Sequence, residues 1–185
     1  MSDKIVYIDL GATGGETIRS FLTCRSFCPE LAVMRNIEVY GFEPVDYAEA
    51  WRETIADFPT VKIRVFNKAV GTENKKVRLS LHSNPEAHTV LTDNVNYAED
   101  TAIEVDQVDI VEWLWDNVLW SDTIILKLDI EGAEYGILEK LIESGYANFI
   151  DHIFVEFHNW LLPAEYAERE KKIRENFPMT IGHWG

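Results

Sequence analysis

The sequence predicts an α/β fold built on a doubly wound, mostly parallel β-sheet. Continuous apolar runs alternate with amphipathic segments whose apolar residues recur at helical spacing. The runs are apolar on both faces, which is typical of parallel strands covered by helices on two sides. A length of 185 residues, with 46% hydrophobic residues, fits one domain with a substantial core. We therefore expect residues 1–185 to form a single domain.

Each element has a local signal. The predicted strands are residues 5–10, 39–42, 61–70, 123–130 and 152–157. The predicted helices are residues 16–28, 46–58, 132–144 and 164–176. Pro29, Pro59 and Gly145 follow the first three helices, where such residues end a helix. Asp109 and Glu112 have the spacing of a capping box, which predicts a further helix start.

Residues 61–106 interrupt this alternation. Residues 75–81 alternate apolar and polar side chains, so with residues 61–70 they predict a β-hairpin whose turn is residues 71–74. Residues 83–106 show no sustained period and are rich in Asn, Asp and Thr. We expect this irregular stretch to cover a bound substrate.

The charge of the chain limits its partners. Seventeen basic and 32 acidic side chains leave a net charge of −15. Nucleic acids and anionic membranes attract basic surfaces, so we expect neither as a partner and favour a neutral or cationic small molecule. No run approaches the roughly 18 apolar residues of a membrane span, and a strand begins too early for a signal peptide.

The two cysteines, Cys24 and Cys28, fall on the apolar face of the first predicted helix. We expect buried thiols rather than zinc ligands, because no second Cys or His pair stands at ligand spacing. Unpaired thiols favour a cytoplasmic location.

The segment from Asp9 to Thr17 joins the first strand to the first helix and contains three glycines. Glycines let the backbone turn sharply and approach a ligand, and the helix N-terminus offers unpaired N–H groups. We expect this loop, with Asp9, to hold a carboxylate and an amine of a ligand. A strict dinucleotide fingerprint would need glycines where Thr13 and Glu16 stand, which disfavours a nicotinamide or flavin oxidoreductase.

Glu43 ends the second strand and precedes Pro44. In a doubly wound sheet, a carboxylate at this position can accept hydrogen bonds from both hydroxyls of a ribose. Together with the glycine loop, Glu43 predicts a ligand that contains adenosine.

Four polar side chains lie at the ends of the last two predicted strands: Asp129, Glu131, Glu156 and His158. Ligands of such sheets bind beyond the carboxyl ends of the strands, so we expect these side chains at one rim. Lys127 and Asp129 interrupt an otherwise apolar run, where charged residues need partners. A His beside carboxylates suits a general base near neutral pH.

These motifs, in this order, resemble those of the FkbM family of S-adenosylmethionine-dependent methyltransferases. The resemblance runs from about residue 5 to residue 158 and rests on DLGATGG, GFEP, NKAVG, LKLDIEGAE and VEFH. It implies a Rossmann-like class I methyltransferase fold whose final antiparallel edge is truncated, in a chain that could be one domain of a longer protein. It also implies S-adenosylmethionine as cofactor and S-adenosylhomocysteine as product. The implied cofactor-binding residues are Asp9, Gly11, Ala12, Thr13, Gly15, Thr17, Glu43, Pro44, Asn67, Ala69 and Asp129.

The resemblance further implies an O-methyltransferase whose acceptor is a hydroxyl group of a sugar or glycoside. The implied catalytic residues are His158 as base, with Asp129, Glu131 and Glu156 around it. An oxygen-rich set of Asp129, Glu156 and Asn159 would permit a divalent metal ion, which we do not favour.

Alternative functions stay open. One is a non-catalytic module that binds the cofactor, and another is a methyltransferase for a different small-molecule hydroxyl. A nucleic-acid amino-methyltransferase is disfavoured by the acidic charge and by DIEG where a D/N-P-P-Y type motif is expected. Trp113, Trp115, Trp120 and Trp160 could form a sugar-stacking surface, but we expect them in the core.

Overall fold

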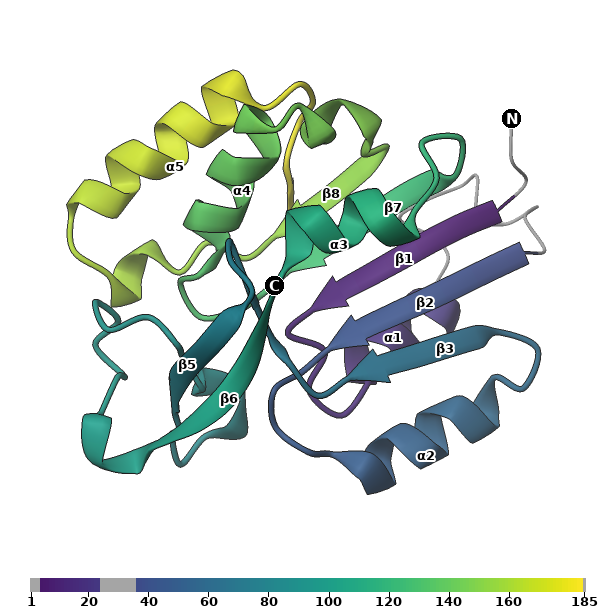
Figure 1. Cartoon of the computed structure of the whole chain (residues 1–185), viewed down its shortest axis with the longest axis horizontal. Helices are drawn as coiled ribbons and strands as arrows, with labels where there is room; N and C mark the ends of the chain where they lie inside the picture. The colour runs from purple at the N-terminus through teal and green to yellow at the C-terminus, as the bar shows by residue number, and fades with distance from the viewer. Residues whose placement is uncertain (1–3, 24–35, 185) are drawn as a thin grey trace.

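The computed structural model describes residues 4–23 and 36–184, which form two β-sheets with surrounding helices (Figure 1). The main sheet has six strands in the order β3-β2-β1-β7-β8-β9, and all neighbouring strands in it are parallel. The chain winds from β1 outward to β3, then returns beside β1 and winds outward to β9. This confirms the doubly wound α/β fold.

The bounds of the elements agree closely with the predicted ones in most of the chain. The strands of the main sheet are β1 (Lys4–Leu10), β2 (Asn36–Phe42), β3 (Lys62–Phe66), β7 (Thr123–Leu128), β8 (His152–Val155) and β9 (Gly182–His183). The helices are α1 (Glu16–Thr23), α2 (Ala48–Asp57), α3 (Ile110–Asn117), α4 (Glu134–Glu143) and α5 (Glu165–Asn176). Residues 24–28 of the first predicted helix, with Cys24 and Cys28, and Pro29 after it lie outside the described residues.

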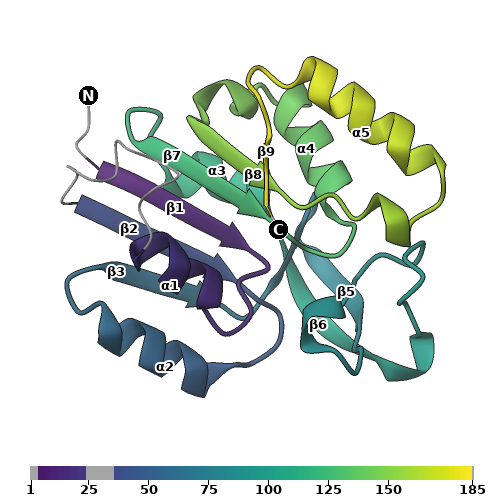
Figure 2. The same ribbon diagram turned by 180° about the vertical axis from the view of Figure 1, so that it is seen from behind.

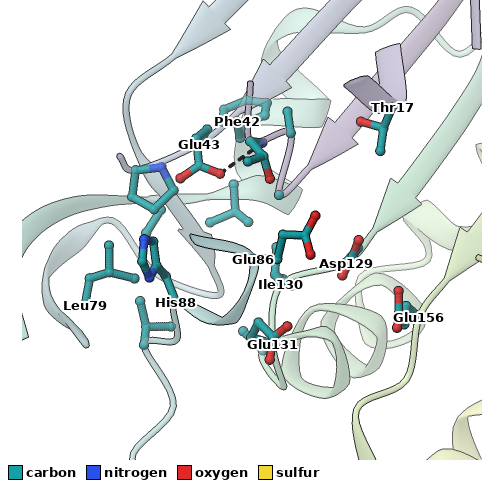
Figure 3. A pocket seen from close by; sticks show the side chains of 18 of the residues that line it. Thr17, Phe42, Glu43, Leu79, Glu86, His88, Asp129, Ile130, Glu131 and Glu156 are labelled. Atoms are coloured by element: carbon teal, nitrogen blue, oxygen red, sulfur yellow. Dashed lines mark hydrogen bonds between the residues drawn. The ribbon is translucent and has the colours of Figure 1, made fainter. Parts of the chain in front are cut away.

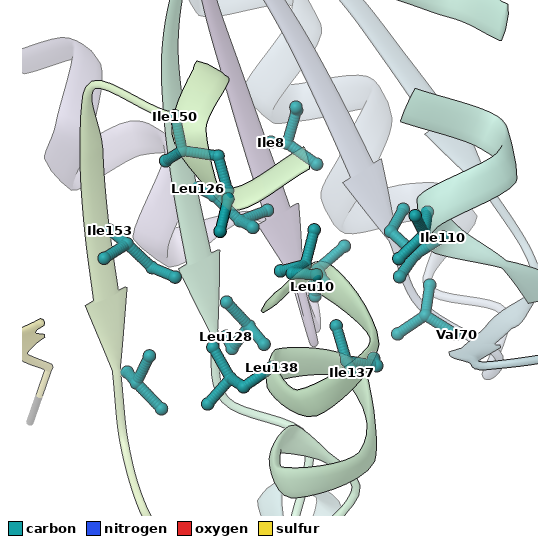
Figure 4. Close-up of a cluster of buried hydrophobic side chains, with 14 of the residues drawn as sticks. Ile8, Leu10, Val70, Ile110, Leu126, Leu128, Ile137, Leu138, Ile150 and Ile153 are labelled. Atoms are coloured by element: carbon teal, nitrogen blue, oxygen red, sulfur yellow. The ribbon is translucent and has the colours of Figure 1, made fainter. Parts of the chain in front are cut away.

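Side chains of the main sheet alternate between two apolar layers. On β1, Tyr7 packs with the helices α1 and α2, which Figure 2 shows on one face of the sheet. Ile8 and Leu10 point to the other face, where they meet Leu126 and Ile137 under α3 and α4 (Figure 4). The central strands are thus covered on both sides, which explains their continuous apolar runs.

The predicted β-hairpin of residues 61–81 is wrong. The smaller sheet has the order β4-β6-β5, so β6 (Ala102–Asp109) lies between β4 (Ala69–Gly71) and β5 (Lys75–Ser80). The β6 strand pairs parallel to β4 and antiparallel to β5. The segment between β4 and β5 contacts the end of β6, where the Asn74 side chain accepts the Asp109 N–H at 2.9 Å. Pairing with a distant segment, which no local pattern reveals, therefore replaces the hairpin.

Several smaller predictions are also settled. Asp109 caps α3 by accepting the N–H groups of Val111 and Glu112. Gly145 follows α4 with a positive φ of 76°, as expected for the end of a helix. The final sheet edge is short, as expected, but β9 is parallel to β8 rather than antiparallel. Among the described residues, no helix has the length and apolar character needed to cross a membrane.

The expectation of a tryptophan core holds for one residue of the four. Trp113 packs edge-on against Tyr40 and Phe42. Trp115, Trp120 and Trp160 instead expose 51%, 76% and 63% of their surface. Trp115 lies on α3, Trp120 between α3 and β7, and Trp160 after β8, all at the protein surface.

Candidate active site

A cavity of roughly 470 Å³ lies at the carboxyl ends of β1, β2, β7 and β8, within the size range of small-molecule sites. The smaller sheet stands beyond the ends of β1, β2 and β3, and it closes one side of this region (Figure 1). The cavity is lined by segments that follow the strands and by Val70 and Leu79 of the smaller sheet. The sheet topology thus brings motifs from the whole chain to one place.

The glycine loop joins three strand ends. Gly11 has a φ of +83°, and a Cβ atom there would lie 1.8 Å from the backbone oxygen of Asp129. Only glycine fits this close approach between the loop after β1 and the loop after β7. The N–H groups of Gly11 and Ala12 both donate to Phe42 O at 3.1 Å, which ties the loop to the end of β2.

The Glu43 side chain links the end of β2 to the glycine loop. Its Oε2 accepts the Thr13 N–H at 3.1 Å, and its Oε1 accepts the Val45 N–H at 2.9 Å (Figure 3). Burial raises the pKa of Glu43, and these two backbone bonds oppose the rise. Each carboxylate oxygen has a second lone pair, so Glu43 retains the capacity to accept bonds from a ligand in the cavity.

Beneath the loop lies a buried charge cluster. The Lys127 ammonium is 3.0 Å from Asp9 Oδ1, 3.3 Å from Asp129 Oδ2 and 2.9 Å from Gly11 O. Thr17 donates its hydroxyl to the other Asp9 oxygen. Burial alone would lower the pKa of Lys127, but the two carboxylates outweigh it and raise the pKa. The cluster connects β1, β7 and α1. It supplies the partners that Lys127 and Asp129 need, because charged side chains are seldom buried without them.

Most predicted site residues line the cavity. From the cofactor-binding set, those in the lining are Gly11, Ala12, Thr13, Thr17, Glu43, Pro44, Ala69 and Asp129. The four predicted catalytic residues line it too: Asp129, Glu131, Glu156 and His158.

Three predicted residues do not line the cavity. Asp9 is fully buried and engaged by Thr17 and Lys127, so its carboxylate supports the loop from below. A Cβ atom at Gly15 would lie 2.9 Å from Thr54 on α2, which shows that this glycine serves the packing of α1. The amide of Asn67 donates to Val45 O at 3.3 Å, behind Glu43.

The rim beyond β7 and β8 is built around His158. Its Nε2 lies 3.4 Å from Glu131, 3.7 Å from Asp129 and 3.9 Å from Glu156, measured to carboxylate oxygens. Its Nδ1 lies 2.9 Å from Glu134 Oε1. Figure 3 shows Asp129, Glu131 and Glu156 on one side of the cavity and Glu43 on the other. The adjacency of β7 and β8, as predicted, produces this cluster.

These carboxylates change the protonation of His158. Burial would lower its pKa, but the hydrogen bonds and charges of Glu131 and Glu134 raise the pKa to about 10. The ring is therefore an imidazolium at neutral pH and must lose a proton before it can act as a base. Burial and the neighbouring Asp129 raise the pKa of Glu156 above that of an ordinary glutamate. Glu156 is also the carboxylate farthest from the His158 ring.

Glu134 organises this rim, although the sequence showed only that it stands at a helix start. It is fully buried; Oε1 accepts the Ile130 N–H at 2.8 Å, and Oε2 accepts the Gly132 N–H at 2.9 Å. Its third partner is His158. A carboxylate in the first turn of a helix usually satisfies backbone donors, but here it also orients the imidazole.

Glu131 is held in a conformation that few side-chain-bearing residues adopt, with a φ of +54°. Two buried side chains fix it, because Thr89 Oγ1 and Asn94 Nδ2 each donate to Glu131 O at 2.8 Å. Both residues belong to the irregular stretch that the sequence associated with substrate. No local pattern could identify Thr89 and Asn94, since their partner lies about 40 residues away.

The same stretch forms part of the cavity wall. Asn84, Glu86, His88 and Val90 line the cavity opposite the glycine loop. Short helical turns interrupt the stretch at η3 (Pro85–Ala87) and η4 (Glu99–Thr101), and its end is β6. Its role as a substrate cover stays a prediction.

Asp129, Glu156 and His158 could also hold a divalent metal ion, since one ligand atom of each lies within 4.8 Å of the others. The amide nitrogen of Asn159, the third predicted ligand, donates to Glu170 on α5 at 2.8 Å. A metal would have to displace the His158 proton and compete with Lys127 for Asp129. We therefore favour a site that works with side chains alone.

We expect enzyme treated with EDTA and then freed of it to retain full turnover. We also expect added Mg²⁺ or Mn²⁺ not to raise the rate. Both follow from a reaction in which the charged side chains of the rim need no Lewis acid. Parallel assays of treated and untreated enzyme on one acceptor make the check. A loss of turnover that Mg²⁺ restores would show that the rim is a metal site.

The fold is a doubly wound α/β fold with a cavity at its topological switch point. The sequence model described as "Methyltransferase FkbM domain" matches residues 9–176. The chain belongs to this FkbM methyltransferase family. Its fold is similar to the crystal structure of methyltransferase FkbM from Methylobacillus flagellatus KT, with a TM-score of 0.57 and 15% identity. The match covers 96% of this chain and 39% of that chain. No protein of curated function matches the sequence.

Proposed function

We propose that this protein is an S-adenosylmethionine-dependent O-methyltransferase whose acceptor is a hydroxyl group of a sugar or glycoside. The observation that carries the proposal is one cavity with two chemically different ends. A carboxylate with spare acceptor capacity lies beside the glycine loop, and a titratable carboxylate–imidazole rim lies beyond β7 and β8. Such a division suits a cofactor on one side and an acceptor on the other.

Glu43 supports the cofactor half of the proposal. Its position after β2 and its remaining lone pairs suit the two hydroxyls of a ribose. The apolar side chains of Ala69, Val70 and Leu79 line the same cavity and would suit an adenine ring. When bound, S-adenosylmethionine would supply a methyl group on a sulfonium, and its departure leaves neutral S-adenosylhomocysteine.

The rim supports the acceptor half. The acceptor oxygen would form the new bond to the methyl carbon as the carbon–sulfur bond breaks, and its proton must pass to a base. We assign this proton to Glu156, because Asp129 is paired with Lys127 and His158 is already protonated. Glu131 Oε2 is buried and has no hydrogen-bond partner among the described residues, so it can accept a bond from the acceptor or the methionine amine.

Calorimetric titration with S-adenosylhomocysteine tests the proposal. We expect saturable binding with a Kd in the micromolar range, about 8 kcal/mol. Glu43→Ala should weaken binding by at least about a hundredfold, because it removes a charged acceptor of two hydrogen bonds. Glu38→Ala is the matched control, since Glu38 lies on the same strand but pairs with Lys62 away from the cavity.

The result also separates the alternatives. NAD serves as a second ligand, and binding of NAD without S-adenosylhomocysteine would contradict a methyltransferase site. Binding of S-adenosylhomocysteine with no methyl transfer to any sugar acceptor would indicate the non-catalytic module. Transfer to a small hydroxyl compound but to no sugar would leave the cofactor half intact and correct the acceptor.

A further inference from the structure

We propose that Trp160 and the neighbouring Val95 form a shelf that binds the pyranose ring of the acceptor outside the cavity. This inference rests on the proposed function and adds the residues that would select a ring-shaped acceptor. Trp160 lies in η6 (Asn159–Leu161), directly after the rim residue His158. Its side chain exposes 63% of its surface, and Val95 exposes 73%. Contiguous exposed apolar patches that are rimmed by polar residues mark ligand or interaction sites, and we propose that these two side chains form such a patch.

The shelf is continuous with the catalytic rim. The rings of Trp160 and His158 have centroids 5.3 Å apart and are inclined by 49°. His158 lines the cavity, whereas Trp160 lies just outside its wall. In the geometry that we propose, the reacting hydroxyl of the acceptor lies at Glu156 and the rest of its ring extends past His158 to this tryptophan.

The shelf is also held in place. Val95 N donates to Leu161 O at 2.9 Å, which links the irregular stretch to η6. The adjacent Asn94 donates to Glu131 O and is itself buried. These hydrogen bonds fix the backbone segments that carry the two apolar side chains relative to the rim. A platform that is positioned before binding costs little ordering when the ligand arrives.

The chemistry of the shelf fits a pyranose. A pyranose presents C–H bonds on its faces and hydroxyls at its edge, and the electron-rich face of an indole attracts such C–H groups. The carboxylates of Glu131 and Glu156 lie 3.4 Å and 3.9 Å from Nε2 of His158, whose ring neighbours Trp160, so the same rim offers acceptors for the hydroxyls of a bound ring. A flat apolar surface beside hydrogen-bond acceptors is the combination that distinguishes a sugar ring from a short, flexible alcohol.

The other two exposed tryptophans lack these features. Trp115 packs against Tyr146 and Phe149, and none of the three lines the cavity. Trp120 precedes β7, so it lies at the opposite end of the sheet from the carboxyl-end cavity. Trp120 therefore provides a matched control with comparable exposure.

The test titrates a panel of methyl glycopyranosides into the whole protein in the presence of S-adenosylhomocysteine. Binding is followed by saturation-transfer NMR of the glycoside and by tryptophan fluorescence. We expect at least one glycoside to bind. Its binding should change the tryptophan fluorescence of wild type and of Trp120→Phe. It should leave the tryptophan fluorescence of Trp160→Phe unchanged. Trp160→Ala should weaken this binding about tenfold, and Trp160→Phe should restore part of it.

A kinetic comparison gives a second readout. For the glycoside that is methylated, Trp160→Ala should raise KM about tenfold while kcat stays close to wild type, because the shelf binds acceptor without touching the reacting atoms. Glycoside binding that is equal in wild type and Trp160→Ala, or the absence of any glycoside binding, would overturn the inference. Titration of each variant with S-adenosylhomocysteine is scored separately. If wild type does not bind S-adenosylhomocysteine, the proposed function is contradicted. If wild type binds it but Trp160→Ala does not change glycoside binding, only the inference about the shelf is contradicted.

Discussion

Lys127→Met is expected to destabilise the protein by about 3–5 kcal/mol, the typical cost of removing one partner from a buried ion pair. The Lys127 side chain has no exposed surface, and neither does that of Asp9. The substitution would leave the Asp9 carboxylate buried with only the neutral hydroxyls of Thr17 and Tyr7 as partners among the described residues, and it would free Gly11 O. Urea denaturation of both proteins, with the midpoint and slope compared, measures the effect.

Lys62→Met is the control for this prediction. Like Lys127, Lys62 pairs with a carboxylate, that of Glu38, but its side chain is 47% exposed. We therefore expect Lys62→Met to lower the free energy of unfolding by less than about 1 kcal/mol. The double variant with Asp9→Asn and Lys127→Met should recover part of the stability, because no uncompensated charge then remains on β1. If Lys127→Met cost no more than Lys62→Met, the cluster would not be the structural centre that its burial indicates.

Glu156→Gln is expected to lower kcat by about 10²–10⁴, the usual contribution of a general base, with little change in the affinity for S-adenosylhomocysteine. A base acts in its unprotonated form, so kcat/KM should rise with pH through the pKa of Glu156. Burial and Asp129 raise that pKa, so the rise should occur at higher pH than for an exposed glutamate. Above the pKa of Glu156, kcat/KM should stay constant through neutral pH.

The pH profile distinguishes Glu156 from His158, the base that the sequence suggested. With His158 as base, kcat/KM would keep rising through neutral pH toward its pKa of about 10. Such a profile, or a Glu156→Gln enzyme as active as wild type, would return the role to His158. Glu168→Gln is the control, because Glu168 is an exposed residue of α5 that does not line the cavity.

Much of the fold was predictable because its signals are local. The β1 and β7 runs are apolar on both faces, and this property alone indicates a parallel sheet between two helical layers. The smaller sheet was not predictable in the same way. β6 carries charged side chains among its apolar ones and pairs with strands more than 20 residues away, so its neighbours could not be read from its own sequence.

The residues of the candidate site were also only partly predictable, for the same reason. Asp129, Glu131, Glu156 and His158 were predictable because each follows a strand, and the carboxyl ends of adjacent strands meet at one rim. Glu134 was overlooked as a site residue, because a glutamate at a helix start is ordinary until its contact with His158 is known. The environments of individual side chains depend on such contacts across the sequence.

By itself, the sequence determined the alternation of strands and helices in the main sheet from β1 to β8, the turn at Gly11 and the positions of the polar residues at the strand ends. These properties depend on residues that are close together along the chain. The tertiary structure decided that β6 separates β4 from β5, that His158 is protonated and that Trp160 is exposed beside the rim. Each of these depends on distances between segments far apart in sequence, since strand pairing, electrostatic shifts and burial are sums over spatial neighbours.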